Sequence, residues 1–114
     1  MNTSRPVSIT LVACLYILIG VAGGAFHFKE LVTRQPDAVM IEVTELVALV
    51  CGVFMLRGQN WARWLALAWV ALHVIISWFH PFKELAMHLV LCVVIAWVLF
   101  RPEGGRYFRN SAAV

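Results

Sequence analysis

The sequence predicts an all-α protein, a four-helix transmembrane bundle made of two tandem helical-hairpin repeats. Three observations predict this class: an excess of apolar residues, their grouping into long blocks, and a short word that occurs twice. Hydrophobic residues make up 62% of the 114 residues and charged residues 13%, whereas a soluble domain is about half apolar and about a quarter charged. A soluble fold of this length has too much surface to hide such an apolar area. We therefore expect residues 1–114 to form a single four-span transmembrane domain.

Four apolar blocks are long enough to cross a membrane, and the predicted spans are residues 7–28, 38–56, 62–80 and 83–100. A transmembrane helix needs roughly 20 predominantly apolar residues. The first block has no Asp, Glu, Lys or Arg from Val7 to Phe28. The second block is equally long but carries Glu42 and Glu45. Because the four spans occupy most of the chain, no room remains for a soluble domain.

The basic residues predict the orientation of these spans. Four spans bring both termini and the 57–63 loop to one side, which holds Arg5, Arg57, Arg63, Arg101, Arg106 and Arg109. The opposite side holds fewer basic residues, namely Lys29, Arg34 and Lys83. Lys and Arg in short loops favour the cytoplasmic side, so the sequence predicts an inner-membrane protein with both termini in the cytoplasm. Arginines beside spans favour the lipid bilayer and its anionic headgroups as partners, and not nucleic acid.

The repeated word is "FHFKEL" at residues 26–31 and "FHPFKEL" at residues 79–85. Each copy is expected where a helix leaves the outer leaflet and the chain turns back. Pro81 suits the first turn of the following helix, where its missing N–H would be unsatisfied anyway. A unit of two spans returns to its starting side, so the two copies predict parallel repeats, which occur in transporter folds and in simple duplicated hairpins.

Small residues at a spacing of four predict where the helices pack. The three candidate pairs are Gly20 with Gly24, Ala48 with Gly52, and Ala62 with Ala66. Helices in lipid associate through such small faces. The pattern is typical of packing inside the bundle and also of a homodimer, so both arrangements stay open.

Ionisable residues inside spans are costly and usually face the bundle interior or water. The candidate site residues are Glu42, Glu45, His73, His88, His27 and His80. At 1.5 Å per helical residue, Glu42 and Glu45 lie roughly 5 and 9 Å inside the outer boundary, and His88 and His73 roughly 6 and 10 Å. All of them fall in the outer half. This common depth predicts a polar chamber that opens to the outside.

Two functions remain open for such a protein. The first is a non-catalytic accessory or scaffold subunit of a larger membrane complex, in which a Glu45–His pair is only an interhelical contact. The second is a protein that handles a small molecule, a proton, a metal ion or haem, with His73 and His88 as the most buried pair for bis-imidazole ligation. Histidine titrates near neutral pH, and imidazole suits zinc, copper and iron. No hydrolase or nucleotide motif occurs, and "EGG" at 103–105 lies in a short tail, so we expect no enzyme.

The whole chain resembles the small uncharacterised four-helix integral membrane proteins of bacteria. The resemblance is carried by "CGVFMLRGQNWARWLALAWVALHV" at 51–74, by "FRPEGGRYFR" at 100–109 and by the two F-H turns. It implies a membrane location and this topology, and no activity. In length and helix count the chain is also similar to small multidrug-resistance exporters. Those depend on an acidic residue in the first span, whereas here the candidates are Glu42 and Glu45 in the second.

Overall fold

The structure is a computed structural model that describes residues 5–33 and 35–112, with side chains described as far as Arg109. Every regular element in these residues is helical. The first helix runs from Val7 to Val32 in three consecutive segments. In chain order the elements are α1 (Val7–Leu18), η1 (Ile19–Gly23), α2 (Gly24–Val32), α3 (Ala38–Leu56), α4 (Asn60–Ser77), α5 (Phe82–Phe100) and α6 (Pro102–Ala112). The predicted all-α class is confirmed, and it consists of five helices, the last of which was not expected.

Three of the helices are long and apolar enough to cross a membrane, namely Val7–Val32, Ala38–Leu56 and Phe82–Phe100. The first extends to Val32, beyond the predicted end at residue 28. The third predicted span, residues 62–80, corresponds to α4, which runs from Asn60 to Ser77. Asn60, Arg63 and His73 make α4 less apolar than the other three.

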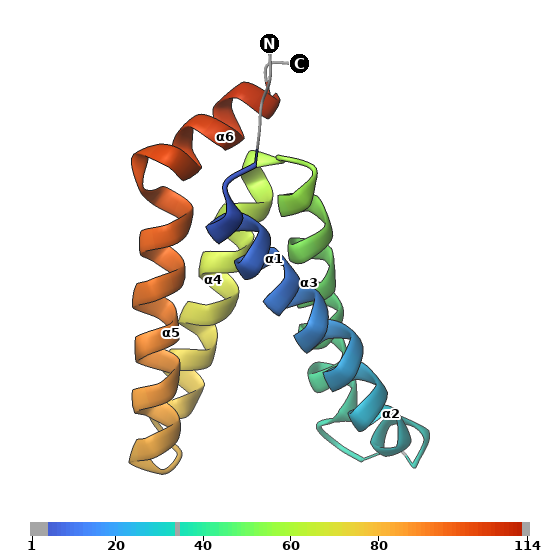
Figure 1. Cartoon of the computed structure of the whole chain (residues 1–114). Coiled ribbons are helices and arrows are strands. Elements are labelled where there is room, and N and C mark those ends of the chain that lie inside the picture. The colour runs from blue at the N-terminus through green and yellow to red at the C-terminus, as the bar shows by residue number, and fades with distance from the viewer. Residues whose placement is uncertain (1–4, 34, 113–114) are drawn as a thin grey trace.

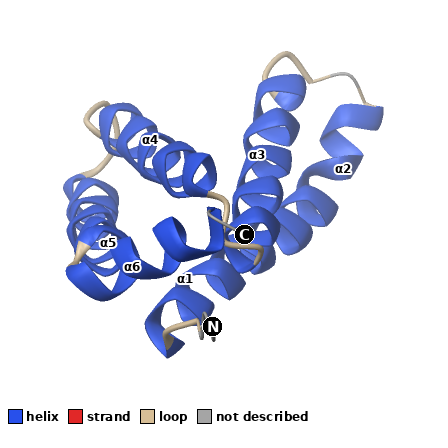
Figure 2. Ribbon diagram, turned by 90° about the horizontal axis from the view of Figure 1, so that it is seen from above, coloured by secondary structure: helices blue, strands red, loops and turns tan. Residues whose placement is uncertain are grey.

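The helices form two antiparallel pairs (Figure 1). One pair, here called the acidic hairpin, is Val7–Leu56; the other, the histidine hairpin, is Asn60–Phe100. The pairs meet near α6 and separate toward the turns at residues 33–37 and 78–81, seen from above in Figure 2. We call these two ends of the molecule the α6 end and the turn end. Contacts of α3 with α4 and of α1 with α5 join the hairpins, whereas α2 contacts α3.

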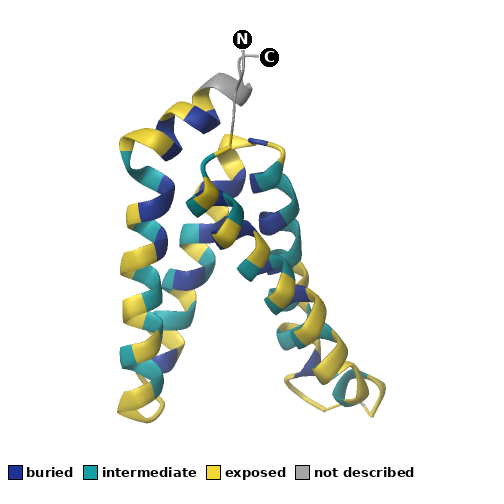
Figure 3. Cartoon of the chain, viewed as in Figure 1, coloured by how far each residue is buried: buried dark blue, intermediate teal, exposed yellow. Residues whose placement is uncertain are grey.

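The core lies toward the α6 end, where the two hairpins meet (Figure 3). Its largest fully buried side chains are Tyr16, Phe108, Ile9, Met55, Leu99, Val70 and Cys51. The Tyr16 hydroxyl crosses from one hairpin to the other and donates a hydrogen bond of 2.7 Å to the Ala66 carbonyl. Ala48, Ala62 and Ala66 are fully buried, so these predicted packing residues lie inside the molecule.

Close approach of the first helix to α3 depends on two glycines. A Cβ added at Gly20 would lie 2.6 Å from Leu49 Cβ and 2.7 Å from the Leu49 backbone nitrogen. A Cβ added at Gly52 would lie 2.6 Å from the Ala13 carbonyl oxygen. Gly24 has more room, because its nearest neighbour is Glu42 Oε2 at 3.7 Å. Gly20 and Gly52 therefore pack within the acidic hairpin.

The connection between the hairpins is a compact turn at Gly58. This residue has a φ of 74°, which glycine adopts without steric cost. The Gly58 N–H donates to the Met55 carbonyl at 3.0 Å, and the Gln59 N–H donates to the Phe54 carbonyl at 3.0 Å. This pair of bonds is the Schellman arrangement, which satisfies carbonyls at the end of a helix. It ends α3 and reverses the chain into α4.

Helix α6 occupies the segment that was expected to be a tail. Pro102 begins it, where a missing N–H costs nothing, and Glu103 in the first turn suits the helix dipole. The helix is amphipathic: Tyr107 and Phe108 are buried against the spans, and Arg106 is exposed. The Tyr107 hydroxyl lies 3.1 Å from the Met55 carbonyl oxygen and 2.9 Å from that of Leu56. Helix α6 thus brings one hydroxyl donor to the carbonyls at the end of α3.

Two of the arginines that were expected to anchor the protein at headgroups are instead built into this end. The Arg63 guanidinium lies between the Phe100 and Phe108 rings, 4.6 and 5.2 Å from their centroids. Arg101 donates a hydrogen bond of 2.7 Å to Ser8 Oγ. Arg34, which was counted at the opposite end, lies outside the described residues.

Candidate functional site

The six candidate residues fall into two groups, one in each hairpin. The acidic group is His27 on α2 with Glu42 and Glu45 on α3. The histidine group is His73 on α4, His88 on α5 and His80 in the turn between them. Because the hairpins separate toward the turn end (Figure 1), a common depth does not bring the two groups together. Within the described residues, no group of three or more His, Cys, Asp and Glu side chains is placed to hold a metal ion.

The Glu45 carboxylate lies directly against the backbone of the first helix. A Cβ added at Gly23 would overlap the carboxylate and lie 2.7 Å from Glu45 Cδ. Gly23 belongs to η1, a short π-helix in the middle of the first helix. Such π-bulges are rare and occur frequently at functional sites. The bulge was not predicted from the sequence, although glycines at 20, 23 and 24 lie at the same place.

One buried oxygen of each carboxylate in the acidic group has no partner in the described chain. Glu42 Oε1 and Glu45 Oε2 are buried and make no hydrogen bond within the described part of the chain. His27 does not supply one, because its Nδ1 lies 2.9 Å from the Gly23 carbonyl oxygen of its own helix. A buried polar atom without a partner carries a desolvation cost of about 1–3 kcal/mol, and more when the group is charged. The expected Glu45–His contact is therefore not the bond that satisfies Glu45.

The two histidines within α4 and α5 are held by their own helices. His73 Nδ1 lies 2.8 Å from the Trp69 carbonyl oxygen, and His88 Nδ1 lies 2.9 Å from that of Glu84. The Ser77 hydroxyl, which is buried, lies 2.7 Å from the same His88 nitrogen. The two imidazole centroids are 5.8 Å apart with an interplanar angle of 34°. These rings form a pair that spans the interface of α4 and α5.

Trp69 links the histidine group to the other hairpin. Its ring stacks on His73 with centroids 3.9 Å apart, and its Nε1–H donates to the Thr44 carbonyl of α3 at 2.8 Å. Neither Trp69 nor Ser77 is among the candidate residues of the sequence analysis. The spacing of four residues from Trp69 to His73 and from His73 to Ser77 is the pattern that could have indicated both, since such residues share one helix face.

His80 does not belong to this pair in space. It is exposed in the turn, and its Nδ1 lies 4.0 Å from Glu84 Oε2, which is also exposed. An exposed pair of this kind contributes little, with a typical range of about 0.2–1 kcal/mol. His80 therefore fits a solvated position at the turn end better than a binding role.

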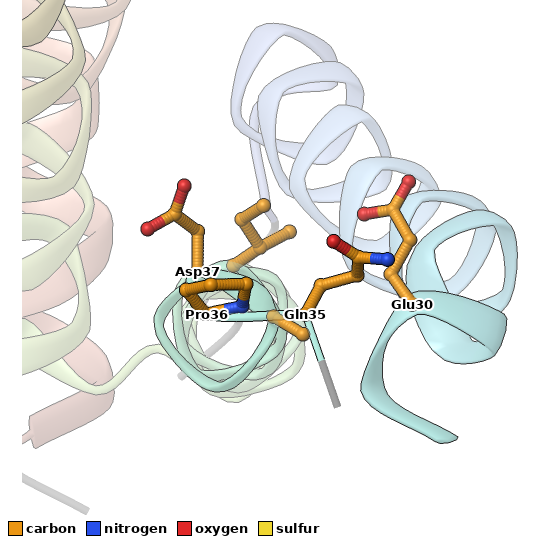
Figure 4. Close-up of a pocket in the computed structure, with 6 residues that line it drawn as sticks. Glu30, Gln35, Pro36 and Asp37 are labelled. Atoms are coloured by element: carbon orange, nitrogen blue, oxygen red, sulfur yellow. The ribbon is translucent and has the colours of Figure 1, made fainter. Parts of the chain in front are cut away.

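A pocket of about 310 Å³ lies at the turn between α2 and α3. Figure 4 shows the Gln35 amide beside Glu30, with Asp37 directed away from both. Its lining consists of Glu30, Gln35, Pro36, Asp37, Ala38 and Ile41. Two of the lining residues, Glu30 and Asp37, are acidic, and Glu42 lies one helical turn beyond Ala38.

Comparison with protein families, with curated proteins and with solved structures finds no match to this chain. The function is therefore argued from the residues themselves.

Proposed function

We propose that this chain is a four-span inner-membrane protein in which the Glu42–Glu45 pair takes up a proton or a small cation. The acidic hairpin is the working part, and the histidine hairpin completes the bundle. The observation that carries the proposal is the burial of Glu42 Oε1 and Glu45 Oε2 without a hydrogen-bond partner in the described chain.

Chain connectivity supports α4 as the fourth span. Helix α3 ends at the α6 end and α5 begins at the turn end, so the chain between them has to cross from one side to the other. Only residues 57–59 and 78–81 lie outside the helix in this stretch. The 18 residues of α4, at 1.5 Å each, extend about 27 Å, which approaches the roughly 30 Å of a hydrocarbon core.

Charge supports the orientation with both termini cytoplasmic. The α6 end holds most of the basic residues, namely Arg5, Arg57, Arg63, Arg101, Arg106 and Arg109. The described basic residues of the turn end are Lys29 and Lys83. Lys and Arg beside spans favour the cytoplasmic side. The two copies of the repeated word, both close to the turn end, support an origin from two tandem hairpins.

At membrane depth, the unpartnered carboxylate oxygens favour the binding of a proton or a cation. In a low-dielectric setting an isolated ionised carboxylate is so unfavourable that it changes its protonation state or acquires a counter-charge. Acidic residues within spans mark ion pathways and proton relays for this reason. Gly23 in the π-helix has no Cβ, which allows the Glu45 carboxylate to lie against the backbone of the first helix.

A second candidate, the accessory or scaffold subunit, is favoured by the apolar side chains that the two hairpins leave uncovered. Large exposed hydrophobic residues occur on the spans of both hairpins, for example Leu18, Leu46, Val90 and Val93. Lipid, a second copy of the chain or another subunit could cover them. Under this function the carboxylates contribute to stability or assembly only.

The two functions separate in one experiment with Glu45→Gln and Glu42→Gln, and with the exposed Glu84→Gln as a matched control. We would reconstitute each protein in liposomes and record the infrared carbonyl stretch of protonated carboxyl groups as pH and sodium concentration are varied. The proposal expects a band at neutral pH, or its replacement on sodium binding, that disappears in Glu45→Gln and persists in Glu84→Gln. If the band and its response to sodium are the same in all three variants, the carboxylate pair takes up neither a proton nor a cation, and the scaffold function is the one that remains.

A further inference from the structure

The histidine pair is independent of the proposed function of the acidic hairpin. His73 and His88 come from neighbouring antiparallel helices, and both rings are partly buried. Their centroids are 5.8 Å apart. Ionisable residues within membrane spans are costly and usually functional. The two imidazoles at this depth are therefore candidates for a binding site.

The hydrogen bonds favour a tautomer in which Nε2 of each ring is free. The contacts of His73 Nδ1 with the Trp69 carbonyl and of His88 Nδ1 with the Glu84 carbonyl are 2.8 and 2.9 Å long. A carbonyl oxygen only accepts, so each Nδ1 carries the hydrogen in the neutral tautomer that makes this bond. The Ser77 oxygen, 2.7 Å from His88 Nδ1, can accept from the same tautomer. Each Nε2 then has a lone pair and no hydrogen. Metal-ligating histidines show the same arrangement, in which the second ring nitrogen donates to a backbone carbonyl and fixes the tautomer.

The rings are also held in place by their neighbours. Trp69 stacks on His73, and its own Nε1–H is bonded to Thr44 on α3. The buried Ser77 hydroxyl lies against His88 Nδ1. Ligands held by packing and by such outer hydrogen bonds form the more effective metal sites. Neither ring needs to lose a proton to bind a metal, because both Nε2 atoms are already unprotonated.

We propose that His73 and His88 bind one copper ion in its monovalent state through their Nε2 atoms. Imidazole is a good copper ligand, and monovalent copper is stable with as few as two ligands. Zinc sites use at least three protein ligands, and calcium and magnesium require oxygen ligands. In the described chain no third His, Cys, Asp or Glu joins these two. Haem would need space for its macrocycle between α4 and α5, which pack directly against one another.

The test is a titration of the metal-free protein in detergent with monovalent copper, without oxygen and in competition with a coloured copper chelator. We expect one equivalent to be withdrawn from the chelator by the native protein. His73→Asn and His88→Asn should each weaken binding at least tenfold. Asparagine retains a nitrogen that can donate to the helix carbonyl, so these variants keep the helix bond and remove only Nε2. His27→Asn and His80→Asn are the matched controls and should bind as the native protein does.

Circular dichroism and gel filtration establish that each variant is folded before it is titrated. The proposal is overturned if the native protein withdraws no copper from the chelator, or if the control variants weaken binding as much as the two ligand variants. A parallel titration with zinc that gives one equivalent, in a protein that leaves copper on the chelator, would also overturn the assignment. None of these outcomes depends on Glu42 or Glu45, so the proposed function is tested separately.

Discussion

The two hairpins carry nearly the same word, yet the chain turns at a different place in each. In the acidic hairpin, residues 26–31 lie within α2, and the turn follows at residues 33–37. In the histidine hairpin, Phe79 and His80 are already in the turn, and the rest of the word starts α5. Pro81 lies at the N-cap of α5 with a φ of −53°. One inserted proline thus decides whether the same side chains end one helix or begin the next.

The hairpins also differ in regularity. The first helix has 26 residues against 19 in α3, whereas α4 and α5 have 18 and 19. The extra length of the first helix includes the π-helix that faces Glu45. The histidine hairpin has matched helices without such a bulge, and the Nδ1 atoms of His73 and His88 lie against carbonyls of their own helices. The irregular hairpin is the one with buried carboxylate oxygens that lack a partner in the described chain, and π-helical backbone of this kind is frequent at functional sites.

The largest effect is expected from a proline in the first copy of the repeated word, close to where the second copy has one. Phe28→Pro places the proline of the second copy inside α2, where it removes a helical N–H and its ring collides with the preceding turn. We expect a loss of about 3 kcal/mol in the free energy of unfolding. Unfolding in mixed detergent micelles, followed by circular dichroism, measures it. Pro81→Ala is the reverse change and should cost less than about 1 kcal/mol. Equal losses in the two variants would contradict different positions for the two words.

A second prediction distinguishes Gly20 from Gly24 in the first span. Gly20→Ala places a methyl group against the Leu49 backbone, at 2.7 Å from its nitrogen, and should cost about 1–3 kcal/mol by overpacking. Gly24→Ala meets its nearest neighbour at 3.7 Å and should change stability by no more than about 0.5 kcal/mol. Thermal unfolding of both variants in the same detergent tests the difference. A homodimer through the whole motif predicts instead that both variants lower the mass found by light scattering.

The smallest effect concerns the contact between the hairpins. Trp69→Phe keeps an aromatic ring near His73 but removes the hydrogen bond to the Thr44 carbonyl, so it should cost about 1 kcal/mol. Trp78→Phe, at a position that is 71% exposed, is the control and should be close to neutral. Fluorescence-detected unfolding compares the two. If Trp78→Phe is the more harmful change, the proposed role of Trp69 as the link between hairpins is wrong.

Much of the fold was predictable because membrane spans depend on composition over long windows. The helices around Val7–Val32, Ala38–Leu56 and Phe82–Phe100 lie where the apolar blocks predicted them. Helix α6 was not predicted, because its two glycines and its charges at 103–109 resemble a polar tail. Its stability comes from the burial of Tyr107 and Phe108 against distant residues, which no local pattern reveals.

The type of each candidate residue and its depth along the span were predictable from the sequence. The positions of these residues relative to one another across the bundle were not. Depth follows from counting residues along a helix, and it indicated Glu42, Glu45, His73 and His88 together. Whether helices converge or diverge at that depth depends on packing elsewhere, here on the glycine contacts of α1 with α3 and on the core near α6. The structure consequently separates one expected chamber into an acidic and a histidine group.

Helix α6 has a consequence for the order in which the molecule is assembled during synthesis. Tyr107 contacts the carbonyls of Met55 and Leu56, and Phe108 supplies one of the two rings beside Arg63. Both residues are translated after every span. Both turns at the opposite end are complete before that, since chains fold from the N-terminus as they emerge. The cytoplasmic end of the proposed topology is therefore the last part of the molecule to close, and until then Arg63 lacks one of the two rings that enclose it.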